Sequence, residues 1–260
     1  MTDATPRWTG SGTGERAVVL LHGIGGGAGL WQPTLPSLSD YRVLAWDMPG
    51  YGASAPLGEP GFPALAAALA RMLDAAEVER ADLVGHSIGG MVALEFALTW
   101  PDRVRSLVLY ASPPAFGGRN PAFREAFLAA RLAPLEAGRS MAEVAEALIP
   151  GLLGEDPDPA ALPAALASMA AVPAAAYRAT LATLVGFDRR ASLERLEVPV
   201  LVLVGEGDPM APFPVMHGMA GEIPGAQFAI LAYAGHLAHL ERPHDFNAVL
   251  GNFLTAVGDD

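Results

Sequence analysis

The sequence predicts an α/β fold, with a mostly parallel sheet that carries helices on both faces. Apolar runs of strand length alternate with helical patterns along most of the 260 residues, and this alternation is typical of parallel sheets. Between residues 112 and 190 the alternation stops, and only helical patterns occur among alanine, leucine and proline. We therefore expect an α/β core formed by residues 1–111 and 191–260, with residues 112–190 inserted as a helical lid.

The strands are expected at apolar runs that are bounded by turn residues. In chain order these runs are Ala17–Leu21, Arg42–Trp46, Asp82–Val84, Val104–Tyr110, Val200–Val204 and Gln227–Leu231. Residues 1–15 are polar and leave room for one short strand, around Arg7–Thr9.

The helices are expected where apolar residues recur at helical spacing or where alanine dominates. In the core these segments are Leu30–Leu38, Leu65–Ala76, Met91–Leu98, Val215–Ala220 and Pro243–Val257. In the lid they are Pro121–Leu132, Met141–Ile149, Ala160–Ala170 and Ala174–Leu184. Because the carboxyl ends of parallel strands meet at one edge of a sheet, we expect a functional site at that edge.

The motif with the most chemical content is Leu-Val-Gly-His-Ser-Ile-Gly-Gly at residues 83–90, where a strand turns into a helix at Ser87. Gly85 and Gly89 flank the serine where side chains would collide, and the N–H of Ile88 is unpaired at the start of the helix. With 29 glycines in the chain, a chance Gly-x-Ser-x-Gly match is an alternative. The strand before the motif and the helix after it favour a nucleophile elbow.

A second glycine-rich segment, His22–Gly27, follows the first apolar strand. It lacks the Gly-Lys-Ser/Thr and Gly-x-Gly-x-x-Gly patterns of phosphate-binding loops, which disfavours nucleotide binding. We expect the N–H groups of Ile24 and Ile88 to form an oxyanion hole, and His22 to pin the loop. Asp47 precedes Met-Pro-Gly and is interpreted as a turn residue.

A serine nucleophile needs a base, and the base needs a partner that fixes its tautomer. His236 follows the last strand and Asp208 follows the strand before it, so both are expected at the same edge as Ser87. Glu206 is the alternative partner of the histidine. His236 and His239 have the spacing of a metal pair, but no third ligand is evident, so no metal is expected and His239 is placed at the surface or the pocket edge.

Aromatic residues in the apolar segments are candidates for a substrate pocket. They are Trp31, Phe116 and Phe213, although an aromatic in a long apolar stretch is more often part of the core. His86 adjoins Ser87, and we expect its side chain to point away from the hydroxyl and to pack.

The order Ser87, Asp208, His236 resembles that of the α/β-hydrolase fold serine hydrolases, over residues 17–257 except for the lid. Gly-Asp-Pro at 207–209, Gly-His-Leu-Ala-His-Leu-Glu-Arg-Pro at 235–243, Asp-Phe-Asn at 245–247 and Ile-Pro-Gly-Ala at 223–226 are similar to the 3-oxoadipate enol-lactonase group. The resemblance implies hydrolysis of a carboxylic ester or lactone through an acyl-enzyme, with no cofactor. A substrate carboxylate, as in an enol-lactone, would need an arginine in the lid. The candidates are Arg119, Arg124, Arg131 and Arg178.

Two other functions stay open at this point. Hydrolases of carbon–carbon bonds in ring-cleavage products use the same three residues and differ in the polarity of the pocket. A small-molecule receptor on the same fold can also retain the three residues, with slow or no turnover.

Composition limits the partners. The net charge of −12 argues against nucleic acid and anionic membrane surfaces, so the expected partner is a small ester or lactone. No apolar stretch approaches the roughly 20 residues of a membrane helix, and the start lacks a signal-peptide pattern, so a cytoplasmic protein is expected. The absence of cysteine and lysine excludes disulfides, thiolate ligands and lysine Schiff bases. The sequence leaves the oligomeric state open.

Overall fold

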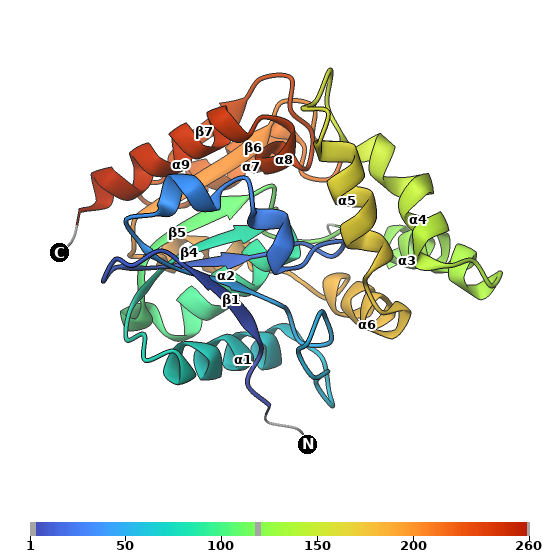
Figure 1. Cartoon of the computed structure of the whole chain (residues 1–260), viewed down its shortest axis with the longest axis horizontal. Coiled ribbons are helices and arrows are strands. Elements are labelled where there is room, and N and C mark those ends of the chain that lie inside the picture. Colours follow the sequence, from blue (N-terminus) through green and yellow to red (C-terminus); the bar gives the residue numbers. More distant parts are fainter. Residues whose placement is uncertain (1–3, 118–120, 259–260) are drawn as a thin grey trace.

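The computed structural model describes residues 4–117 and 121–258, which contain a seven-stranded sheet in the order β1-β3-β2-β4-β5-β6-β7 (Figure 1). The strands are β1 Trp8–Ser11, β2 Ala17–Leu21, β3 Arg42–Trp46, β4 Ala81–His86, β5 Val104–Tyr110, β6 Val200–Gly205 and β7 Gln227–Leu231. Strands β2 to β7 run parallel, and β1 pairs with β3 in the antiparallel direction. The predicted α/β fold with a mostly parallel sheet is confirmed.

The central strands form because every residue in them is buried. β2 and β6 are apolar runs with both faces covered, and β4 is also buried throughout although it contains Asp82 and His86, whereas β7 at the edge is partly exposed. β4 extends two residues beyond the predicted end at Val84, since Gly85 and His86 pair with Leu109 and Tyr110 of β5. This extension brings the strand directly to Ser87.

Helices cover both faces of the sheet. They include α1 Phe62–Ala75, α2 Ile88–Thr99, α7 Phe213–Glu222 and α9 Pro243–Val257. In Figure 1, α1 lies below the sheet and α9 above it. The single helix predicted for Leu30–Leu38 is instead two 3₁₀ turns, Ala28–Trp31 and Leu35–Leu38, because Pro33 and Pro36 lack the N–H groups that a continuous helix needs.

The insertion consists of four longer helices that lie together on the right of Figure 1. They are α3 Pro121–Glu136, α4 Met141–Leu148, α5 Ala161–Ala170 and α6 Ala174–Leu184. A β-bridge between Ala115 and Asp188 joins the two ends of this segment. α4 begins at Ser140, whose hydroxyl accepts the N–H of Glu143 in a capping box.

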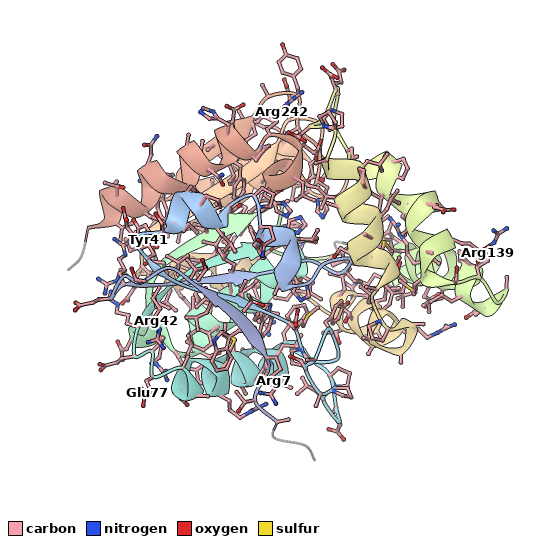
Figure 2. The ribbon with its side chains drawn as sticks, viewed as in Figure 1. Arg7, Tyr41, Arg42, Glu77, Arg139 and Arg242 are labelled. Carbon is pink, nitrogen blue, oxygen red and sulfur yellow. The ribbon has the colours of Figure 1, made fainter. Side chains whose placement is uncertain are left out.

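One short helix, α8 Ala238–Glu241, was not predicted, because four residues are too few to show a helical period. Arg242, labelled in Figure 2, follows it. Its guanidinium donates to the carbonyl oxygen of Glu155 in the lid segment at 2.7 Å. The chain after β7 is therefore attached to the lid. Within the described residues, no helix has the length and apolarity that crossing a bilayer requires.

Candidate active site

Ser87 lies at the sharp turn between β4 and α2, with φ 53° and ψ −122°, in a region that residues other than glycine rarely adopt. A side chain at Gly85 would collide with the backbone of Gly90, and one at Gly89 with the carbonyl oxygen of Leu21. Such a conformation costs about 1–3 kcal/mol and persists only where the surroundings hold it. The turn leaves Ser87 on the wall of a cavity.

Two backbone N–H groups near this turn are available to a ligand. Ile88 is the first residue of α2, so its N–H has no acceptor within the helix. Ile24 lies in the glycine loop after β2 and lines the same cavity as Ser87. Within residues 4–117 and 121–258, neither N–H donates a hydrogen bond.

His22 holds the glycine loop in place. Its Nε2 accepts the N–H of Met48 (3.0 Å), so its Nδ1 carries the proton and donates to the carbonyl oxygen of Gly23 (2.7 Å). Burial lowers the pKa of His22 to about 4, which keeps the ring neutral in this role. Asp47 acts in the adjoining turn, where its carboxylate accepts the N–H of Ala28 (3.0 Å).

His236 and Asp208 form a buried pair. Nδ1 of His236 lies 2.8 Å from Oδ2 and 3.0 Å from Oδ1 of Asp208, and Oδ1 also accepts the N–H groups of Met210 (2.7 Å) and Ala211 (3.0 Å). Burial raises the pKa of Asp208, but His236 and these amides together outweigh burial and hold the pKa below its usual value. The ionised carboxylate therefore fixes the proton on Nδ1 and leaves Nε2 as an acceptor. Glu206 instead accepts the N–H of Tyr233 (3.1 Å).

Glu241 holds the backbone on both sides of His236, a role that was not predicted from the sequence. Its buried carboxylate accepts the N–H groups of Gly235 (3.0 Å), Leu237 (3.0 Å) and Gly154 (2.6 Å), the last of which lies in the lid segment. The N–H of His236 donates to the carbonyl oxygen of Leu152 (2.7 Å), also in the lid segment. The sequence contains no local signal for this role, because His239, Arg242, His244 and Asp245 make the stretch around Glu241 polar.

The carbonyl oxygen of His236 is held as well. It accepts hydrogen bonds from His86 Nε2 (2.9 Å) and the Tyr110 hydroxyl (3.1 Å), and that hydroxyl accepts the N–H of His239 (3.2 Å). Burial lowers the pKa of His239 to about 3. Burial also lowers the pKa of His86 to well below 6.5, and the neighbouring histidines lower it further. The expectation that His239 lies at the surface or pocket edge is wrong, because its ring packs against Trp31 beneath the site (4.8 Å between centroids).

The cavity that Ser87 and His236 share has a volume of about 80 Å³. Its other walls are mostly apolar side chains from the lid, such as Met169 and Leu181. Among the described residues that line it, Arg131 carries the one permanent charge.

The three aromatic residues proposed for the pocket lie elsewhere. Trp31 is fully buried against His239, and Phe213 is 42% exposed and stacks on His217. Phe116 lines a neighbouring groove beneath α3. The aromatic rings on the cavity wall are those of Phe127 and Tyr177, together with the imidazoles.

Comparison with known proteins places the chain among hydrolases. A profile of the family described as alpha/beta hydrolase fold matches residues 16–243. The chain is 31% identical over 244 residues to RutD of Stutzerimonas stutzeri strain A1501, which bears the name of a carbamate hydrolase, with 91% of each chain covered. It is 31% identical over 253 residues to the pimeloyl-(acyl-carrier protein) methyl ester esterase of Aliivibrio salmonicida strain LFI1238, with 95% of each covered. The enol-lactonase from Burkholderia xenovorans LB400 has the same fold, with a TM-score of 0.87 and 24% identity over 96% of both chains.

We predict that Glu241→Gln destabilises the protein, whereas Glu155→Gln in the exposed part of the lid segment does not. The amide of glutamine turns a donor toward backbone N–H groups, and a buried N–H without an acceptor costs about 1–3 kcal/mol. Urea denaturation measures the difference, and hydrogen exchange should show faster exchange at Gly154, Gly235 and Leu237. Equal free energies of unfolding for the two variants would contradict this role.

The buried neutral histidines predict a pH dependence of stability. His22, His86 and His239 have folded-state pKa values below 6.5, so under acid conditions the unfolded chain binds protons that the folded chain does not. Their contribution to stability is complete above about pH 6.5 and is lost as the pH falls toward 4, at up to about 1.4 kcal/mol per pH unit for each histidine.

Denaturation curves between pH 7.5 and 4.5 measure this slope. His239→Gln should reduce the slope of the unfolding free energy against pH by the equivalent of one bound proton. His244→Gln, at an exposed histidine, should leave this slope unchanged. A free energy of unfolding that is constant over this range would refute the prediction.

Proposed function

Because the chain belongs to the alpha/beta hydrolase fold family, we propose that it hydrolyses a carboxylic ester or lactone through an acyl-enzyme on Ser87. The observation that carries this proposal is that Ser87 and His236 line the same cavity, while Nδ1 of His236 is hydrogen-bonded to Asp208. A hydroxyl, a base and an orienting carboxylate are the parts that serine acyl transfer needs.

In the first half of the reaction, Oγ of Ser87 attacks the substrate carbonyl carbon while Nε2 of His236 takes the hydroxyl proton. The carbonyl oxygen becomes an oxyanion that accepts the N–H groups of Ile24 and Ile88. Asp208 stabilises the imidazolium that forms. When the tetrahedral intermediate collapses, the imidazolium returns the proton to the leaving oxygen, and the acyl group stays on Ser87.

In the second half, a water molecule takes the place of the alcohol. His236 removes a proton from the water as it attacks the acyl carbon, and the same two N–H groups hold the second oxyanion. Collapse returns the proton to Ser87 and releases the carboxylic acid. In a lactone the leaving oxygen stays joined to the acyl chain, so ring opening gives a single product.

Both the cavity and the relatives bear on the substrate class. The walls are mostly apolar, which favours an uncharged acyl group near Ser87. One of the relatives is named for the hydrolysis of a methyl ester, which supports ester chemistry at this site. A lactone that bears a carboxylate is a more specific candidate. Arg131 supports it, because this arginine lines the cavity while Arg124 and Arg178 do not; Arg119 lies outside the described residues.

We predict that Ser87→Ala folds normally and loses ester hydrolysis by about 10⁴-fold or more, as removal of a serine nucleophile does elsewhere. Steady-state hydrolysis of 4-nitrophenyl acetate measures the change. Ser112→Ala is the matched control: Ser112 lies two residues after the end of β5 and does not line the cavity, so its variant should stay within a few fold of the parent.

Two outcomes would refute the proposal. One is near-normal turnover by Ser87→Ala. The other is a parent protein that binds esters without hydrolysing them, which would support a receptor on this fold.

A further inference from the structure

The cavity at Ser87 is small for a complete ester. A single water molecule needs about 10–15 Å³ of such space, so about 80 Å³ admits only a short group beside the reacting carbonyl. A longer ester must extend out of the cavity.

A larger groove adjoins the cavity. We call it the α3 groove: it lies between α3, the segment 113–117 after β5 and the segment 209–215 at the start of α7, and its volume is about 660 Å³. Phe127, Arg131 and Met210 line both the groove and the cavity. The two spaces are therefore neighbours that share one wall of side chains.

The shared wall is held by weak contacts. A guanidinium N–H of Arg131 donates to Sδ of Met210 at 3.8 Å, and the guanidinium carbon lies 5.1 Å from the centre of the Phe127 ring. A thioether is a weak acceptor, and Arg and Met side chains have several rotatable bonds. Movement of these two side chains would join the groove to the cavity at little cost in free energy.

The groove has the chemistry of an apolar binding site. The rings of Phe116 and Phe127 are 4.6 Å apart, and the ring of Phe123 lies 6.1 Å from that of Phe116. Phe123 of α3 and Val215 of α7 both line the groove and are 51% and 45% exposed. Arg190 also lines the groove, but its charge is paired with Asp188. An occupant would cover apolar surface that water now contacts.

We propose that the α3 groove binds the apolar chain of an ester whose carbonyl lies at Ser87, with Arg131 and Met210 moving aside. This inference rests on the proposed hydrolase function and adds the substrate class: esters in which one half is a long aliphatic or aryl chain. Transfer of a methylene from water to an apolar site is worth roughly fourfold in binding. Chain extension into the groove should therefore raise kcat/KM.

The experiment compares two series of esters, one lengthened from two to ten carbons in the acyl half and the other in the alcohol half. For the parent protein, we expect kcat/KM to rise at least tenfold along one series. Phe123→Asp and Val215→Asp each place a charge in the lining of the groove and should each remove this increase. Turnover of the two-carbon ester should stay within about twofold, since neither side chain lines the cavity.

Ile230→Asp is the matched control, because Ile230 is 44% exposed on β7 and does not line the groove. It should retain the chain-length dependence. Hydrolysis of the two-carbon ester with no chain-length dependence in either series overturns the inference and leaves the proposed function intact. A chain-length dependence that survives both groove variants also overturns it. Absence of hydrolysis for every ester contradicts the proposed function itself.

Discussion

The site depends on the left-handed backbone at Ser87. That conformation exists because β4 runs into α2 with almost no connecting residues, and it is tolerated because glycines at 85, 89 and 90 allow the backbones to approach closely. The same turn exposes the serine, leaves the N–H of Ile88 without a helical acceptor and directs both toward the carboxyl edge of the sheet. A parallel sheet is what brings the loops after β2, β6 and β7 to this one edge.

The histidine is positioned by a second, separate set of contacts. Asp208 fixes its ring, the carboxylate of Glu241 holds the backbone on both sides, and two donors hold its carbonyl oxygen. Glu241 also accepts the N–H of Gly154, and the N–H of His236 donates to the carbonyl oxygen of Leu152. These two hydrogen bonds join the lid segment to the loop that carries His236. Burial keeps the supporting histidines neutral, and neutral rings do not compete with His236 for the charge of Asp208.

The sequence predicts the sheet, the elbow and the order of Ser87, Asp208 and His236 because these signals are local: apolar runs, glycines beside a serine, and polar residues directly after strands. It does not reveal the role of Glu241 or the burial of His239, because both depend on segments that meet only in the folded chain. Of the predicted pocket aromatics, Trp31 and Phe213 line neither the cavity nor the α3 groove, since Trp31 and a ring on the cavity wall such as Phe127 look alike in sequence. Periodicity identifies a buried residue, but it does not say which surface that residue faces.

The lid combines firm and loose attachment. Its segment near Leu152 is hydrogen-bonded to the loop that carries His236. The side chains of α3 are at most partly buried, and this helix lines the groove. The central claim remains that Ser87 is the nucleophile of this arrangement. Intact mass spectrometry after treatment with an alkyl fluorophosphonate tests it most directly. The account predicts one adduct per chain, mapped to Ser87 by peptide sequencing, with loss of turnover in proportion to labelling. An active enzyme that remains unlabelled, or an adduct on another residue with Ser87 unmodified, would contradict it.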